Sequence, residues 1–457
     1  MIHLSVMRRF DSWIGWPLAT LLGLWPHGRR AVPAVPRQIV VVKLSGLGSL
    51  LVCAGVFRAL RASQPQARLV VVSLEGTAAA ARLIPEVDDV LSISASGAWR
   101  LLRDGLRVLC ELRRRRVDVI ADIEYFSKLS TVFCALAGAR YRLGFRLPAR
   151  WRQRLIDGGI AFREDIHFRE CVARLLQPLG VDYRNLPDGA ITLPAAAEQD
   201  ADALLGQRTA RKQTRVEQEA TEGTEACPSP ASPEAWAVVN PHATSLCVQR
   251  RWPLERFAQV ADALLQKHPE LRIAIPGTAD ERDRAEELRA QISAAWRDRV
   301  CVLAGRTDLA TLAAVLRRSR LVLTNDTGVM HLAAAAGAPL VALFGPESPV
   351  RYGPAGSGRL NGRMSNVERQ NQEVNASVSR LSPNASLQDS EFDIRHSAVQ
   401  MDYPEARILS GDVPCGPCLS YMNHKRAPCG DEPAACMLAI SVADVRSACE
   451  DVLAAQG

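Results

Sequence analysis

Short apolar runs alternate with longer stretches of helical periodicity along most of the chain. The runs that predict strands are residues 38–44, 68–74, 90–93, 117–120 and 141–145 in the first half, and 236–239, 271–275, 300–303, 321–323 and 339–344 in the second. Nearly continuous apolar strands that alternate with amphipathic helices are typical of parallel sheets with helices on both faces. The pattern therefore predicts an α/β protein built from doubly wound sheets.

The pattern is interrupted twice, and the interruptions suggest the domain boundaries. Residues 196–235 lose periodicity and become rich in Ala, Glu, Thr, Ser and Pro, which predicts a flexible linker between domains at 37–195 and 236–457. Residues 356–412 are polar and aperiodic, which predicts a disordered insertion in the second domain. A chain of 457 residues with 47% hydrophobic content is long enough for two such cores.

Residues 1–36 precede the first domain and contain an apolar stretch at 10–25. It is shorter than the about 20 residues that span a bilayer, and Pro17 interrupts it. Three tryptophans and flanking arginine pairs favour an amphipathic segment that lies on an anionic leaflet. The alternative is an accessory helix packed on the first domain. No small-residue cleavage site follows, which disfavours a signal peptide.

Composition narrows the possible partners and the compartment. A net charge of +7, only 5% aromatic residues and no RNA-binding signature argue against nucleic acid. Twelve cysteines without a cleavable signal favour the reducing cytoplasm, with peripheral contact to the inner face of the cytoplasmic membrane. The spacing of Cys415, Cys418, Cys429 and Cys436 within residues 415–436 predicts a structural zinc site, with four reduced thiols as the alternative.

The strand at 321–323 leads into a polar turn and then a helix at 329–336. Thr327 and Gly328 offer backbone N–H groups at the helix N-terminus, where the dipole favours a diphosphate. Asp326 is placed to face sugar hydroxyls. The alternative is that Asp326 or Thr327 only caps the helix and that His331 is a core histidine.

A second ligand loop follows the first strand, at Ser45-Gly46-Leu47-Gly48-Ser49. Glycines allow a backbone to approach a ligand closely, although such turns are common in doubly wound domains.

The stretch Asp326 to Pro346 reads D-T-G-x-x-H-x-A-x-A-x-G-x-P-x-V-x-L-F-G-P and resembles the signature of glycosyltransferase family 9, the ADP-heptose:lipopolysaccharide heptosyltransferases. The resemblance implies a GT-B fold, in which two Rossmann-like domains face a cleft. It also implies a bacterial, inverting transfer of a sugar, most plausibly a heptose, from an ADP-sugar to a lipopolysaccharide core or related glycolipid, without a metal or other cofactor in the chemistry.

In the first domain, Lys43 and Gly48 match the opening segment of that family. The family has an aspartate proposed as the base where this chain has Ser49, and a serine of ordinary acidity cannot do this work unaided. Asp122 and Glu124 follow the strand at 117–120 and are the substitutes that we consider. The alternatives are a capping aspartate and a surface glutamate.

In the second domain, the family places donor-phosphate contacts in the loop that contains Thr244. Arg250, in Arg250-Arg251-Trp252-Pro253, stands where the family has a diphosphate-binding lysine, and its alternative is a solvated residue. Asp280 and Glu281 follow the strand at 271–275 and are candidates for nucleoside contacts.

Ser49 leaves the activity open at this stage. The leading hypothesis is a metal-independent glycosyltransferase, and the second is a nucleotide-sugar or glycolipid-binding homologue that has lost its base. A third hypothesis is a zinc-stapled scaffold at the membrane, which predicts no nucleotide binding.

Overall fold

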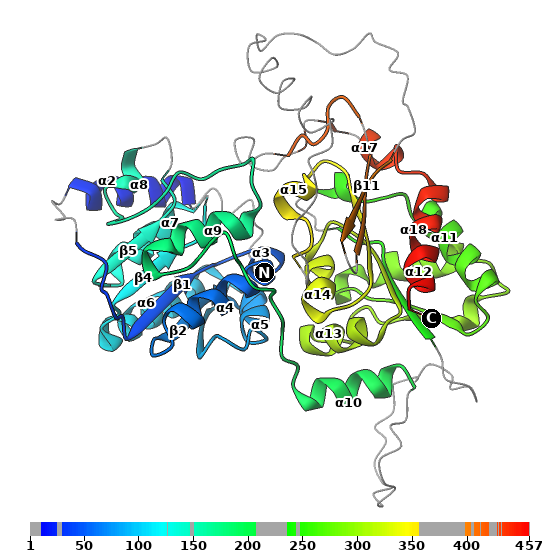
Figure 1. Cartoon of the computed structure of the whole chain (residues 1–457), viewed down its shortest axis with the longest axis horizontal. Coiled ribbons are helices and arrows are strands. Elements are labelled where there is room, and N and C mark those ends of the chain that lie inside the picture. The colour runs from blue at the N-terminus through cyan, green and yellow to red at the C-terminus, as the bar shows by residue number, and fades with distance from the viewer. Residues whose placement is uncertain are drawn as a thin grey trace, which may run out of the picture.

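Two α/β domains make up the computed structural model of the chain (Figure 1). It describes residues 11–24, 30–125, 127–146, 150–206, 235–243, 247–355, 398–403, 406–411, 413–419, 427, 429–430 and 432–456.

The first sheet has the order β3-β2-β1-β4-β5 and its pairings are all parallel. Its strands are β1 (Gln38–Val42), β2 (Arg68–Leu74), β3 (Asp89–Ile93), β4 (Val119–Asp122) and β5 (Tyr141–Gly144). One face packs against α4 (Ala54–Ser63), α5 (Glu75–Ala81) and α9 (Phe168–Leu176). The other packs against α6 (Ala98–Arg115) and α7 (Lys128–Leu136), so both faces are covered as the apolar runs predict.

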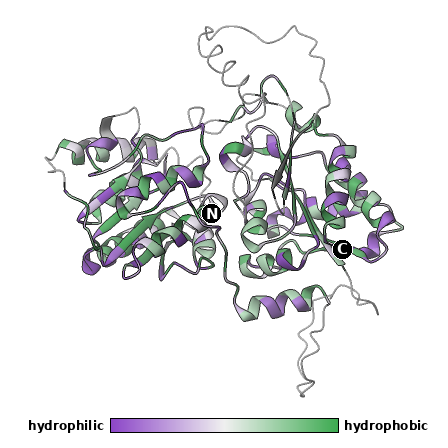
Figure 2. Ribbon diagram, viewed as in Figure 1, coloured by the Kyte–Doolittle hydropathy of each residue, from purple (hydrophilic) through white to green (hydrophobic). Residues whose placement is uncertain are grey.

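The second sheet has the order β11-β12-β10-β9-β6-β7-β8. Its strands are β6 (Ala235–Asn240), β7 (Leu271–Ile275), β8 (Val300–Val302), β9 (Leu321–Asn325), β10 (Leu340–Phe344), β11 (Ala398–Tyr403) and β12 (Ala406–Gly411). Only the β11–β12 pairing is antiparallel among these strands. Helices α13 (Leu309–Arg318) and α14 (Gly328–Ala336) cover one face, and α11 (Leu254–Lys267), α12 (Arg282–Gln291) and α18 (Val442–Ala454) cover the other. The strands are the most hydrophobic layer of each domain (Figure 2).

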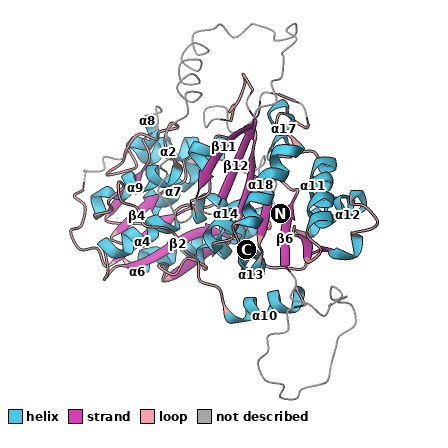
Figure 3. Ribbon diagram, turned by 45° about the vertical axis from the view of Figure 1, so that its right-hand side comes forward, coloured by secondary structure: helices cyan, strands magenta, loops and turns pink. Residues whose placement is uncertain are grey.

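Two of the predicted irregular segments are partly ordered. Residues 195–204 form helix α10 (Ala195–Leu204) rather than the start of a flexible linker, because Glu198 and Asp202 pair with Arg318 on α13. Residues 398–403 and 406–411, predicted within a disordered insertion, form β11 and β12 and extend the second sheet (Figure 3). Residues 207–234 and 356–397 lie outside the described part of the chain.

The amino-terminal segment packs on the first domain as a π-helical turn, η1 (Asp11–Gly15), followed by α2 (Trp16–Leu24). Asp11 accepts hydrogen bonds from the backbone N–H groups of Lys128 and Leu129 at the start of α7, and Ala19 is buried against α7. The same segment exposes Trp13, Trp16, Leu21 and Leu24. Within the described residues, no helix is both long enough and apolar enough to cross a membrane.

Candidate functional site

The two domains meet where the glycine-rich loop faces the Asp-Thr-Gly turn. Helix α3 (Leu47–Leu51) follows β1 and contacts α14, which follows β9. A Cβ atom on Gly48 would lie 2.3 Å from Cδ2 of His331, so only glycine permits this approach. A Cβ on Gly328 would likewise be 3.2 Å from Leu47. The structure thus brings together the two loops that the sequence analysis treated separately.

A buried charge cluster lies on the second-domain side of this contact. Arg250 places its guanidinium 3.3 Å from the carboxylate of Asp326 and 3.3 Å from that of Glu347. Glu347 follows β10 and is buried. Burial by itself lowers the pKa of Arg250, but Asp326 and Glu347 outweigh it and the net shift of the pKa is upward. Arg250 is therefore a fixed cation beside the Asp-Thr-Gly turn and not a solvated surface residue.

Hydrogen bonds hold the turn in shape from the neighbouring strand. The amide of Asn240, at the end of β6, donates to the hydroxyls of Thr324 (2.8 Å) and Thr327 (3.2 Å). Asn325 donates to the carbonyls of Pro241 and His242 and accepts from the N–H of Trp252. Thr327 is the N-cap residue of α14, but its side chain makes no capping hydrogen bond, so the alternative of a simple cap does not hold for it. The first turn of α14 thus presents its backbone N–H groups next to Arg250.

Asp280 and Glu281 follow β7, at the same edge of the second sheet. Asp280 is exposed in the 3-10 turn η4 (Ala279–Glu281) that follows β7. Glu281 accepts hydrogen bonds from the backbone N–H (2.8 Å) and hydroxyl (3.1 Å) of Thr278, so it is occupied as a capping residue. Thr244 lies outside the described residues. His331 is buried in α14 against Gly48 and belongs to the domain contact.

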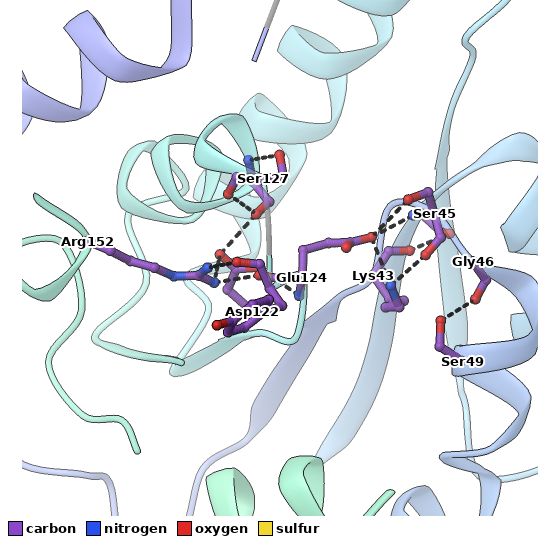
Figure 4. A network of polar contacts seen from close by, with 11 residues as sticks. Lys43, Ser45, Gly46, Ser49, Asp122, Glu124, Ser127 and Arg152 are labelled. Atoms are coloured by element: carbon purple, nitrogen blue, oxygen red, sulfur yellow. Dashed lines mark hydrogen bonds and ion pairs between the residues drawn. The ribbon is translucent and has the colours of Figure 1, made fainter. Parts of the chain in front are cut away.

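On the first-domain side, Glu124 connects β4 to the glycine-rich loop (Figure 4). Its Oε1 atom lies 3.1 Å from Nζ of Lys43 and accepts a 2.7 Å hydrogen bond from the backbone N–H of Ser45. Lys43 in turn donates to the carbonyl of Ser45 at 2.5 Å. Both contacts of Glu124 involve Oε1 and hold the side chain at the loop. The other carboxylate oxygen, Oε2, takes no part in these contacts.

Asp122 is not available as a base, which corrects the sequence-based expectation. It ends β4, is fully buried, and accepts hydrogen bonds from Arg152 (2.8 Å), Ser130 (3.0 Å), Thr131 (2.8 Å) and the backbone N–H of Glu124 (3.1 Å). Burial is the main cause that raises its pKa. Arg152, also fully buried, donates to the carbonyl of Glu124 as well. The Asp122–Arg152 pair therefore fixes the loop that carries Glu124 (Figure 4).

Ser49 and Lys43 lie on either side of Gly46. Its hydroxyl donates to the carbonyl of Gly46 at 2.9 Å. Gly46 has a φ of +90°, and a Cβ there would lie 2.5 Å from Oγ of Ser49 and 3.6 Å from Nζ of Lys43. A residue other than glycine would therefore be strained and would push these two polar groups apart.

A second domain contact involves α15 (Pro349–Tyr352), which follows Glu347. Arg351 reaches the carboxylate of Glu347 at 3.4 Å, the carbonyl of Glu164 in the first domain at 3.0 Å and the carbonyl of Leu419 at 2.9 Å. The Tyr352 ring stacks on Phe168.

His167 completes this contact from the first domain. Its Nδ1 atom accepts from the N–H of Arg169 at the start of α9, so Nε2 carries the proton and donates to the carbonyl of Gly353 at 3.1 Å. Burial lowers the pKa of His167 to about 4.

Sequence reasoning missed Glu347, Arg351, Asn325 and Arg152. Glu347 and Asn325 stand at the carboxyl ends of predicted strands, a position that could have marked them. Nothing in the sequence indicates which residues Arg152 and Arg351 contact.

The four-cysteine segment lies next to the second sheet. Burial, together with the neighbouring thiols, raises the pKa of Cys418 and of Cys436 to about 12 each, and Cys415 and Cys429 are among those neighbours. In the described part of the chain, however, no three His, Cys, Asp or Glu side chains are grouped as a metal site. A structural zinc at Cys415, Cys418, Cys429 and Cys436 stays a prediction, which metal analysis of the purified protein would test.

Two doubly wound α/β domains whose strand-end loops meet in this way have the fold of the GT-B glycosyltransferases. The structure of ADP-heptose LPS heptosyltransferase II from E. coli superposes with a TM-score of 0.62 at 17% identity, covering 92% of this chain and 99% of that one. A glycosyl transferase family 9 structure from Veillonella parvula gives 0.61 at 17% identity, covering 94% and 100% of the two chains.

Sequence comparison finds similarity to the same group of proteins. Residues 177–381 match the model of glycosyltransferase family 9 (heptosyltransferase). It is 36% identical over 105 residues to lipooligosaccharide heptosyltransferase 2 of Haemophilus influenzae, a match that spans 23% of this chain and 30% of the relative. It is 33% identical over 100 residues to lipopolysaccharide heptosyltransferase 2 of E. coli, spanning 22% and 28%. The chain thus matches about 30% of the length of these curated relatives.

Proposed function

We propose that the protein is an inverting glycosyltransferase that moves a sugar from a nucleoside diphosphate to a glycolipid hydroxyl. The observation that carries the proposal is the placement of Arg250 beside Asp326 and the first turn of α14, directly opposite the glycine-rich loop. A cation and a helix N-terminus at one point suit a departing diphosphate, whose negative charge grows as the bond to the sugar breaks. The family match and the similarity to the E. coli ADP-heptose LPS heptosyltransferase II structure favour a heptose from ADP-heptose as donor.

The reaction that we propose is a single displacement. The acceptor hydroxyl attacks the anomeric carbon, its proton passes to Glu124, and the bond from that carbon to the diphosphate oxygen breaks with inversion. Glu124 is the carboxylate that the fold holds at the glycine-rich loop, and its Oε2 atom is the proposed proton acceptor. Ser49 would then orient the acceptor by hydrogen bonding. Positive charge for the leaving group comes from Arg250, so we expect turnover to persist in EDTA.

The acceptor assignment follows from the relatives, which are lipopolysaccharide and lipooligosaccharide heptosyltransferases. We propose a lipopolysaccharide core or related glycolipid, met at the inner face of the cytoplasmic membrane. The exposed apolar face of α2 supports a membrane-proximal location.

The first test is thermal stabilisation by ADP, UDP, GDP and an ADP-sugar. We expect a selective shift with the adenosine compounds, since a ligand that binds only the folded state raises its melting temperature. Asp326→Asn and Arg250→Lys should weaken the shift. Arg251→Lys is the matched control, because the neighbouring arginine pairs with Glu432 outside the cluster. No shift with any nucleotide would contradict the donor site.

The second candidate function is a nucleotide-sugar or glycolipid-binding protein without turnover, and Ser49 is the observation that favours it. Release of nucleoside diphosphate in the presence of a glycolipid acceptor distinguishes the two. An enzyme releases it, whereas a binding protein is stabilised by the nucleotide and releases none.

A further inference from the structure

Helix α6 exposes an apolar ridge that the packing of the first domain leaves uncovered. Trp99, Leu102 and Leu106 are 74%, 55% and 53% exposed and lie at the i, i+3, i+7 spacing of one helix face. The opposite face is buried against the sheet through Val108 and Leu112. The ridge is therefore not needed for the core of the domain.

Exposed arginines border this ridge. Arg100, Arg103, Arg107 and Arg114 follow it along one side, and all four are exposed. The two acidic residues of the helix pair with two of its arginines, Asp104 with Arg103 and Glu111 with Arg115. Arg100, Arg107 and Arg114 therefore still give that side a positive charge. A tryptophan and two leucines beside a row of arginines is the pattern of a helix that lies in the headgroup region of an anionic bilayer.

We propose that the α6 ridge docks on an anionic lipid surface and that it acts together with α2. Both helices belong to the same side of the first sheet, since α6 and α7 cover one face and α2 packs on α7. The strength of interfacial binding grows with the apolar area buried and with the attraction to anionic lipids, so two elements together bind more strongly than either alone. The proposal does not depend on sugar transfer, so it can fail while the proposed function stands.

A lipid surface explains the ridge better than a nucleic acid does. Arginines alone would serve for phosphate contacts, but Leu102 and Leu106 gain nothing from a phosphate backbone. In a bilayer the same two side chains enter the acyl boundary while the arginines meet lipid phosphates.

The test is cosedimentation of the full chain with phosphatidylethanolamine vesicles that contain phosphatidylglycerol. We expect Trp99→Ser/Leu102→Gln/Leu106→Gln to weaken binding at least about tenfold, and Arg107→Gln/Arg114→Gln to weaken it and reduce its salt dependence. Val35→Ser is the matched control, since Val35 is equally exposed but lies outside both helices. The variant Trp16→Ser/Leu21→Gln measures how much α2 contributes to vesicle binding.

A second readout uses the exposed Cys110, which lies on α6 one turn beyond Leu106. Anionic vesicles should slow its alkylation, mapped by mass spectrometry, and leave that of the exposed Cys415 unchanged. Wild-type binding by the α6 variants, or equal binding to phosphatidylcholine vesicles, would overturn the proposal. The proposal would also be overturned if the α6 substitutions abolished self-association or RNA binding but left vesicle binding unchanged.

Discussion

Gly48 and His331 touch across the two domains at a distance that excludes any side chain on Gly48. The contact joins the first turn after β1 to the helix that follows the Asp-Thr-Gly turn. Helix α14, which we propose to bind the donor diphosphate, thus positions the glycine-rich loop, which we propose to bind the acceptor.

Gly48→Ala should therefore lower activity more than it lowers stability. The added Cβ displaces the His331 ring and shifts the two loops relative to each other, at a cost of about 1–3 kcal/mol for overpacking. Nucleoside diphosphate release and thermal unfolding measure the two effects. Gly48→Ala/His331→Ala removes the clash and should recover part of the stability lost by the single variant. If the double variant is no more stable than Gly48→Ala, the clash is not the cause.

Substitutions should show that Asp122 has a structural role and that Glu124 has a catalytic one. Asp122→Asn leaves the buried Arg152 without its countercharge and should destabilise the fold by about 3–5 kcal/mol. Glu124→Gln keeps the shape and should cost little stability, while sugar transfer falls by about a hundredfold or more through loss of the base. Denaturant unfolding and turnover of the same two variants check this. A Glu124→Gln protein with normal turnover would remove Glu124 from the mechanism.

Glu347→Gln should tighten binding of ADP. The substitution removes one negative charge from the cluster of Arg250, Asp326, Arg351 and Glu347, so the local potential becomes more favourable for an anion. Calorimetric titration with ADP measures the affinity, and we expect a gain of several-fold that declines with salt. Arg251→Gln, which removes a cation outside the cluster, serves as the comparison. A weaker affinity in Glu347→Gln would show that Glu347 mainly positions Arg250.

His167 should make stability fall as the pH falls below about 6.5. The folded protein holds His167 neutral with a pKa of about 4, whereas the unfolded chain takes up a proton near pH 6.5. The unfolding free energy is therefore unaffected above pH 6.5 and decreases by up to about 3 kcal/mol as the pH falls to 4.

His167→Asn tests this linkage, because an asparagine still accepts the hydrogen bond from Arg169 but does not titrate. Urea unfolding at several pH values should show a smaller decrease in this variant than in the wild type. Equal pH dependence in the two proteins would assign the effect to other groups.

The apolar runs predicted β1 to β10 to within a few residues, because burial on both faces leaves a continuous local signal, whereas β11 and β12 were missed. Arg250 lies 3.3 Å from Asp326, and the sequence related these two residues only through the family resemblance.

What could not be predicted is how distant charges pair. Arg152 and Asp122 are 30 positions apart, and Arg250 and Glu347 are 97 apart. Their pairing depends on the order of the strands in the sheet, which no local pattern contains. The same reason explains α10, whose composition resembles a linker and whose order depends on Arg318 of the second domain.

Helix α10 also determines where the chain can bend. Thr192 donates its backbone N–H to Leu83 and so still belongs to the first domain, whereas α10 begins at Ala195 and is held on α13 of the second. Any rotation of one domain against the other must therefore pivot at Leu193 and Pro194. The ring of Pro194 fixes one backbone dihedral angle of this hinge, which restricts the directions in which it can open.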